Sequence, residues 1–321
     1  MLAKKIAIVL SVCLCWSAQA SAAPFAYVTN QGDNTVSVVD AATNKVTHAI
    51  KVGTAPVGVA IDANSNRVYI SNVESRSISV IDMLSNRQVY EIKLAIAPVG
   101  IVLSKSGGEL FVADWFHDQI LVVNTETYTQ KHSIKMGKAP AGMVLSREGA
   151  SLYVANRDSN DVGVVNTRTM QVSHKIAVGK HPFGMALSGD GKFLYVVNVE
   201  SNSVSVIDVR RDTVVAAIPV GEHPYCATSN ADGSRIYVTN TYADSVSVID
   251  AKAQKVIATI KVGGTPEGIS YDIKHNRVYV ASWMDNNLSM IDAKTNLVIQ
   301  SIATGAQSRA FGQFIASPST P

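Results

Sequence analysis

The chain has 321 residues, a formal net charge of +3 and three cysteines. A near-neutral chain without a long basic cluster argues against a dedicated nucleic-acid-binding protein, which needs a strongly positive surface. Cys13 and Cys15 stand close to the start, so Cys226 is the one cysteine beyond residue 23 and no internal disulfide can form there.

Residues 1–23 are typical of a cleaved secretory signal peptide. Lys4 and Lys5 give a positive start, and the apolar stretch Ile6–Trp16 is too short to span a bilayer. Small residues offer cleavage sites shortly before Pro24. A retained membrane anchor is the alternative. We therefore expect a periplasmic or secreted protein with a formal charge of +1 once both lysines are removed, and no membrane span in the mature chain.

A short Tyr-Val-x-Asn pattern begins the mature sequence and recurs every 42 residues. The seven copies begin at Tyr27, Tyr69, Phe111, Tyr153, Tyr195, Tyr237 and Tyr279. A Pro-x-Gly element keeps the same period from Pro56 to Pro266. A fixed period of this length is typical of repeat architectures.

Each unit contains four short apolar runs separated by Asn, Asp, Gly and Ser. In the first complete unit the runs are Val57–Ile61, Arg67–Ser71, Ser77–Asp82 and Gln88–Leu94. Ser77–Asp82 alternates polar and apolar side chains, the period of a half-buried strand. Four antiparallel strands in each of seven units predict an all-β, seven-bladed β-propeller.

The first strand, Phe25–Thr29, corresponds to the second strand of a unit, so its blade lacks an inner strand. We expect Arg309–Ile315 to supply that strand and to close the ring, which removes free sheet edges. The predicted organisation is a signal peptide over residues 1–23, a single propeller over 24–317 and a short tail over 318–321.

Two repeat columns have structural explanations. An Asp or Asn ends each third strand, where it suits the first position of a tight turn. A Gly stands two residues after every Pro of this element except Pro224, as in Gly58 and Gly100, where inner strands crowd around the axis and the missing side chain permits their approach.

Three recurring motifs can be compared with known families: the Tyr-Val-x-Asn copies, the Ser-Val-Ile-Asp strands such as Ser205–Asp208, and the joints such as Val52–Gly58. On these motifs the mature chain resembles the YVTN family of β-propeller repeat proteins, and within it the periplasmic YncE-like members. The resemblance implies the propeller fold. Its motifs are scaffold residues and imply no catalytic role.

The copies differ most at the joints that lead from an outer strand to the next inner strand. The residue before Pro is alanine in three early copies but becomes His181 and His223. The residue after Pro changes from Val57, Val99 and Ala141 to Phe183, Tyr225, Glu267 and Arg309. Since small residues suffice in the early copies, the later ones indicate a binding surface around the channel mouth.

The loops between second and third strands lie on the same face and vary in the same way. The predicted ligand- or partner-binding residues on this face are Trp115, Phe116, His117, His181, Phe183, His223, Tyr225, Tyr242, Glu267, Trp283 and Arg309. For each single residue, packing between blades is the competing explanation. The opposite turns, such as Asp62–Ser65, are ordinary polar turns that we expect to face solvent.

His181 and His223 occupy one column of adjacent units and are the candidate ligands of a transition metal, with His117 or Cys226 as a distant third. Two histidines without local Cys or His spacing are too few for a structural zinc site. Cys226 stands in the Gly column and is expected to be a small buried residue. No cofactor is required by the sequence.

Sequence motifs of known catalytic sites are absent: the chain has no Gly-x-Ser-x-Gly, His-Glu-x-x-His, phosphate loop or dinucleotide fingerprint. The sequence therefore favours a non-catalytic scaffold that binds a protein or small molecule through one loop face. A lyase or lactone hydrolase using His181, His223, Glu267 and Arg309 is the first alternative. A periplasmic metal-binding protein is the second.

Overall fold

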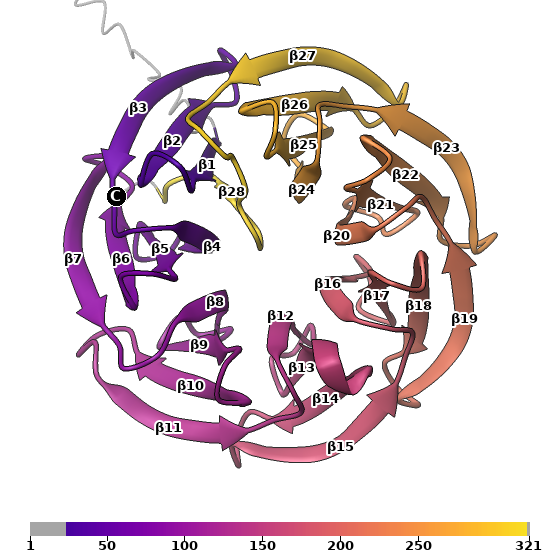
Figure 1. Cartoon of the computed structure of the whole chain (residues 1–321), viewed down its shortest axis with the longest axis horizontal. Coiled ribbons are helices and arrows are strands. Elements are labelled where there is room, and N and C mark those ends of the chain that lie inside the picture. The colour runs from indigo at the N-terminus through magenta and orange to yellow at the C-terminus, as the bar shows by residue number, and fades with distance from the viewer. Residues whose placement is uncertain (1–23, 320–321) are drawn as a thin grey trace, which may run out of the picture.

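Seven four-stranded antiparallel sheets surround a central axis in the computed structural model, which describes residues 24–319 (Figure 1). The all-β, seven-bladed propeller is therefore confirmed. The predicted signal peptide, residues 1–23, lies outside the described residues. Within the described part, no helix has the length and apolar character to cross a membrane.

Strands of the same rank are equivalent in every blade and form four concentric layers (Figure 1). The inner strands are β4 (Pro56–Asp62), β8 (Pro98–Leu103), β12 (Pro140–Leu145), β16 (Pro182–Leu187), β20 (Pro224–Ser229) and β24 (Pro266–Asp272). The second strands are β1 (Phe25–Asn30), β5 (Arg67–Asn72), β9 (Glu109–Asp114), β13 (Ser151–Asn156), β17 (Phe193–Asn198), β21 (Arg235–Asn240) and β25 (Arg277–Ser282).

The third and fourth ranks complete each blade. The third strands are β2 (Thr35–Asp40), β6 (Ser77–Asp82), β10 (Gln119–Asn124), β14 (Asp161–Asn166), β18 (Ser203–Asp208), β22 (Ser245–Asp250) and β26 (Asn287–Asp292). The outer strands are β3 (Lys45–Lys51), β7 (Arg87–Lys93), β11 (Gln130–Lys135), β15 (Gln171–Ala177), β19 (Thr213–Pro219), β23 (Lys255–Lys261) and β27 (Leu297–Ala303). A 3-10 turn, η1 (Arg157–Ser159), lies in the loop between β13 and β14.

The core lies between the blades and is built from the second and third strands. The aromatic column that begins with Tyr27 is fully buried, and its members pack against Val and Ile side chains of neighbouring blades. The outer strands expose most of their side chains. The second and third strands are thus buried on both faces, between neighbouring blades, and the outer strands form the solvent-exposed rim.

The two ends of the chain share one sheet, in the order β28-β1-β2-β3. The closing segment is less regular than predicted, because only Ile315–Ala316 forms a ladder strand, β28, paired with Phe25 and Ala26. Upstream, the N–H of Arg309 donates to the Thr29 carbonyl at 2.9 Å. Gly312 has a φ of +102°, which interrupts the extended conformation between these two contacts.

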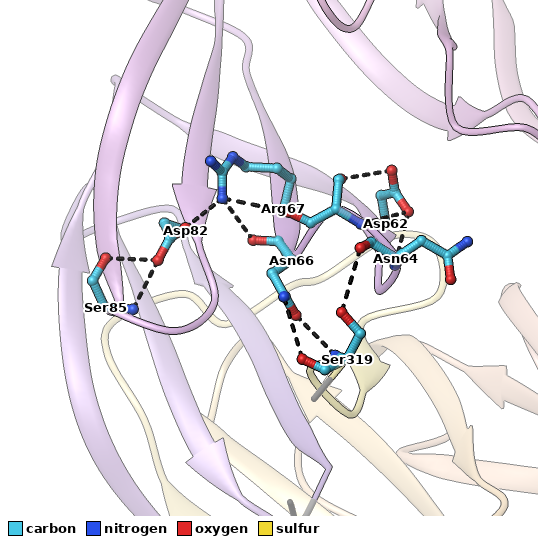
Figure 2. Close-up of polar contacts among 8 residues, drawn as sticks. Asp62, Asn64, Asn66, Arg67, Asp82, Ser85 and Ser319 are labelled. Atoms are coloured by element: carbon cyan, nitrogen blue, oxygen red, sulfur yellow. Dashed lines mark hydrogen bonds and ion pairs between the residues drawn. The ribbon is translucent and has the colours of Figure 1, made fainter. Parts of the chain in front are cut away.

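The tail extends the closure onto the neighbouring blade (Figure 2). The Ser319 N–H donates to the Oδ1 of Asn66 at 2.8 Å, and the Asn66 Nδ2 donates back to the Ser319 carbonyl at 3.3 Å. The Ser319 hydroxyl also donates to the Asn64 carbonyl at 3.3 Å. Figure 2 shows this contact beside the Arg67–Asp82 ion pair of the same blade.

The two structural columns behave as predicted. The Oδ1 of Asp40 accepts the N–H groups of Ala42 and Thr43, and the same turn recurs after the other third strands. A Cβ added to Gly142 would lie 2.1 Å from the Phe183 carbonyl oxygen of the next inner strand. Only glycine permits this approach between inner strands.

At six of the seven joints, the residue in the column of His181 and His223 adopts a left-handed conformation, and a side chain of the preceding blade accepts its N–H. The N–H of His181 donates to the Oδ1 of Asn160, and the N–H of His223 donates to the Oδ1 of Asn202. Four further positions repeat the arrangement, and the exception is Ala97, whose partner position is occupied by Arg76. The joint between β7 and β8 is thus the irregular one.

Candidate functional site

The joints before the inner strands and the loops between second and third strands form one face of the ring, which we call the joint face. The opposite face carries the turns between first and second strands and between third and fourth strands, and we call it the turn face. All of the predicted site residues lie on the joint face, because each belongs to a joint or to one of these loops.

The residues after Pro meet in a closed plug at the centre of the joint face. The Phe183 ring stacks on Tyr225 with centroids 4.2 Å apart and meets Phe311 edge-on at 5.2 Å. The Trp115 ring lies 6.0 Å from Phe183. Val57, Ala141, Phe183 and Phe311 are all buried in one cluster. The predicted channel mouth is therefore filled by apolar side chains.

A buried ion pair forms the polar side of this plug. The Arg309 Nη2 donates to the Oε1 of Glu267 at 3.0 Å, and the Arg309 Nε donates to the other carboxylate oxygen. The Arg309 Nη1 donates to the Gln31 side-chain oxygen at 3.0 Å, and the guanidinium lies 5.1 Å from the Phe311 ring. Every polar atom of the guanidinium thus faces a group of the protein itself.

Burial controls the protonation of this centre. Desolvation raises the pKa of Glu267, although Arg309 opposes the shift. Desolvation disfavours the charge on Arg309, but Glu267 outweighs it and raises the pKa of the guanidinium. Desolvation also raises the pKa of Tyr225, and Glu267 adds to the effect. Glu267 and Arg309 are therefore a paired structural unit rather than free acid and base groups.

The predicted residues Trp115, His181, His223 and Tyr242 form an arc around the plug together with charged residues that were not predicted, across the blades from β8 to β23. The Arg157 guanidinium covers the Trp115 ring at 5.2 Å. His181 lies 3.9 Å from an Asp158 carboxylate oxygen and 2.7 Å from a Glu200 oxygen, the latter without hydrogen-bond alignment. The arc therefore mixes both charges with an aromatic ring.

His223 ends the arc against an aromatic ring. Its imidazole stacks on Tyr242 with centroids 4.1 Å apart and bonds the Thr241 hydroxyl through Nδ1 at 2.9 Å. Desolvation lowers the pKa of His223, while Glu200 opposes the shift. The neutral imidazole is thus favoured at this position.

The loop after β9 departs from the repeat in a way that the sequence analysis did not interpret. Asp114 replaces the Asn that ends most second strands and is fully buried. The His117 Nδ1 donates to an Asp114 carboxylate oxygen at 2.8 Å, and Gln119 Nε2 donates to the same carboxylate at 2.8 Å. His117 therefore belongs to its own loop and leaves its Nε2 facing solvent.

The second residue of each loop points to solvent and forms a single repeat column. Its members are Gly32, Glu74, Phe116, Asp158, Glu200, Tyr242 and Met284. Phe116, Tyr242 and Met284 expose 70%, 66% and 61% of their surface, respectively. The first residue of the loop, such as Trp115, packs inward instead. The sequence analysis missed Met284, although its 42-residue spacing from Tyr242 could have indicated it.

Phe311 is the other residue that the sequence analysis missed. It is the one aromatic residue in a column of aliphatic side chains, which was the available signal. Trp283 is one of the predicted binding residues. Its indole N–H is buried without a hydrogen-bond partner, and its ring makes none of the aromatic contacts of the plug.

The structure brings no third metal-binding side chain to His181 and His223 within the described residues. Over residues 24–319, no three His, Cys, Asp or Glu side chains converge to hold a metal ion. Cys226 is buried beside Gly184, and desolvation raises the pKa of its thiol. A protonated, buried thiol is a poor metal ligand and a poor nucleophile.

A family model described as a YNCE-like beta-propeller matches residues 172–277. A hydrazine synthase from Kuenenia stuttgartiensis has a TM-score of 0.74 at 21% identity, covering 83% of this chain and 91% of its own. A protein of unknown function from Desulfotomaculum acetoxidans has a TM-score of 0.79 at 14% identity, covering 92% and 99%. At these identities both structures show the fold alone.

A local sequence match adds little to this picture. The PE-PGRS family protein PE_PGRS18 of Mycobacterium tuberculosis is 63% identical over 35 residues, which is 11% of this chain and 8% of that protein. The matching segment is too short to compare whole proteins.

Proposed function

We propose that this YncE-like β-propeller is a non-catalytic scaffold that binds a protein partner through its joint face. One observation carries the proposal: Phe116, Tyr242 and Met284 expose large apolar side chains from one loop column around a centre that is filled. Aromatic residues and Met are enriched in protein interfaces relative to the rest of the surface.

The closed ring supports this role because it fixes the loops relative to one another. Every joint except the one before β8 is bonded to a side chain of the preceding blade, as the His223 N–H is to Asn202. A rigid surface loses little conformational entropy on association, which favours affinity. The three carboxylates of the same column, Glu74, Asp158 and Glu200, supply a polar rim between the apolar tips.

The lyase or lactone hydrolase alternative is less well supported by the same geometry. Glu267 and Arg309 neutralise each other inside the plug. His181 faces carboxylates, and His223 is stacked on Tyr242. A catalytic acid or base must reach a substrate, and these groups are engaged with one another or buried.

We further propose that the protein acts in the periplasm or outside the cell. The support is the sequence of residues 1–23, with its two lysines, short apolar core and small residues before Pro24. Determining the N-terminus of the protein recovered from the periplasmic fraction tests this proposal. A cytoplasmic protein that retains residues 1–23 would contradict it.

Site-specific photo-crosslinking in the living cell tests the binding proposal. A photoreactive amino acid at Phe116 or Tyr242 should yield a discrete adduct with a partner. The same residue at Ile273, which is equally exposed on the turn face, is the matched control. Adducts that form from Ile273 but not from either joint-face position would overturn the assignment of the binding face.

A further inference from the structure

A cavity of about 500 Å³ lies in the channel beneath the plug. Five inner strands, β4, β8, β12, β16 and β20, provide most of its wall. The closing segment contributes Phe311, Gly312 and Gln313. The cavity is distinct from the joint face, because its lining starts at Ala141 and Phe183 and continues along the strands away from that face.

The two ends of the cavity differ in their access to solvent. At the joint face, Ala141, Phe183 and Phe311 are buried in the plug. Toward the turn face, lining residues such as Ser104, Val144 and Ser229 are partly exposed, and Gln313 is exposed. The cavity is thus closed at the joint face and opens at the turn face, where the sequence analysis expected only ordinary turns.

The chemistry of the wall changes along the channel. The middle is lined by aliphatic, methionine and glycine residues, including Ile101, Met143 and Met185, together with Cys226. None of the lining residues in the described chain carries a charged side chain. Hydroxyl and carboxamide groups gather near the opening, at Ser104, Thr228, Ser229 and Gln313.

We propose that this channel binds a small, uncharged and mainly apolar molecule that enters from the turn face. Its apolar body lies between Ile101, Met143 and Met185, and its hydrogen-bonding end lies at Ser229 and Gln313. A volume of this size falls in the range of small-molecule sites, which are mostly apolar with a few placed polar groups.

The cost of desolvation makes the cavity favour an uncharged ligand over a charged one. A charged group inside this wall would lose its hydration without gaining an opposite charge, so an ion is disfavoured. An apolar molecule loses nothing comparable and gains contact with the aliphatic wall. The protonated thiol of Cys226, whose pKa burial raises, is consistent with an apolar wall at that depth.

Titration of the whole protein with N-phenyl-1-naphthylamine, a neutral dye that fluoresces in apolar surroundings, tests the proposal. Saturable binding near one dye per chain is expected, and the anionic dye 1-anilinonaphthalene-8-sulfonate should bind at least tenfold more weakly. Gln313→Trp adds bulk at the exposed opening of the channel and should weaken binding of the neutral dye at least tenfold. Val215→Trp, on the exposed outer strand β19, should leave it unchanged.

A second measurement does not depend on a cavity-filling variant. The neutral dye should raise the melting temperature of the unmodified protein, because a ligand that binds only the folded state stabilises it. Phe116→Ala should change neither dye binding nor this rise in melting temperature, which separates the channel from the joint face. Absence of saturable binding, equal binding of both dyes, or binding without a rise in melting temperature would overturn the proposal.

Discussion

Arg309 holds Glu267 in a two-point ion pair at the centre of the joint face, although the two residues belong to neighbouring repeats. The same repeat column contains Val57 and Val99, so the scaffold does not require charge at this position. The pair stands where other repeats have apolar side chains. Apolar replacements of the two residues can therefore measure how much the pair contributes to stability.

Removing one partner of this pair should destabilise the protein more than removing both. Arg309→Met leaves the Glu267 carboxylate buried without its countercharge, which should cost about 3–5 kcal/mol of unfolding free energy. The double variant Glu267→Val with Arg309→Val should recover most of that loss. Urea unfolding followed by circular dichroism measures both.

The loss should depend on pH in a defined direction. Burial raises the pKa of Glu267 in the folded state above its value in the unfolded chain. The contribution of this group to the free energy of unfolding is therefore fully present below the pKa of the unfolded chain and is lost as pH rises through the pKa of the folded protein. Without Arg309 this loss should deepen. The destabilisation by Arg309→Met should thus be smaller at pH 4.5 than at pH 7.5, and an equal cost at both would contradict the account.

His223 should titrate below its ordinary pKa because it is desolvated against Tyr242. Tyr242→Ala exposes the imidazole and should move its pKa up toward about 6.5. A histidine whose pKa is lowered by folding stabilises the folded protein above the pKa of the unfolded chain. That stability is lost as pH falls through the pKa of the folded protein. Nuclear magnetic resonance of the imidazole protons measures the titration.

Tyr90→Ala supplies the matched control for this titration, because Tyr90 stacks on Tyr128 at the rim rather than on a histidine. It should leave the pKa of His223 unchanged. A His223 pKa at or above 6.5 in the unmodified protein would show that burial does not control this group.

Glycine should be required at position 142, where the inner strands β12 and β16 touch. Gly142→Ala places a methyl group against the Phe183 carbonyl and should cost about 2–3 kcal/mol by overpacking. Gly108→Ala is the matched control, since the nearest side-chain atom would be 3.5 Å away. Thermal unfolding of the two variants decides the matter, and equal melting temperatures would refute the close approach.

Closure of the ring should depend on the segment after Gly305. Truncation there removes β28 and the Arg309 contacts to β1, which exposes the apolar edge of the closing blade. The shortened protein should aggregate or melt far below the intact one. Truncation after Ala316 removes the Ser319 hydrogen bonds to Asn64 and Asn66 and should cost about 1 kcal/mol.

Thermal unfolding in dilute solution distinguishes the two truncations. A protein that ends at Gly305 and melts with the intact chain would show that the C-terminal segment does not close the ring. A loss as large for the Ala316 truncation would place the closure in the tail instead.

The fold could be predicted because the same pattern of four short strands recurs in every repeat. The column beginning with Tyr27 fixed the blade number, and the glycine at position 142 followed from crowding at the axis. The irregular closing segment could not be foreseen, because the left-handed turn at Gly312 has no counterpart in the other units.

The site was predicted less well, since repeat columns place residues on a face but not into contact. Phe183 and Tyr225 were placed at an open mouth, whereas stacking with each other and with Phe311 fills it. The channel cavity went unnoticed because its wall consists of strand residues that match the repeat. The plug and the cavity both depend on how far the side chains of all seven blades fill the space around the axis, which no single repeat reveals.

The binding role of the joint face is tested most directly by the affinity of the cross-linked partner for two matched variants. Phe116→Ser with Tyr242→Ser and Met284→Ser removes the three apolar tips, and Leu84→Ser with Ile273→Ser removes comparably exposed side chains from the turn face. Isothermal titration calorimetry should show at least a tenfold loss of affinity for the first variant and none for the second, with unchanged melting temperatures. Unchanged affinity of the first variant, or a loss confined to the second, would contradict the proposed function.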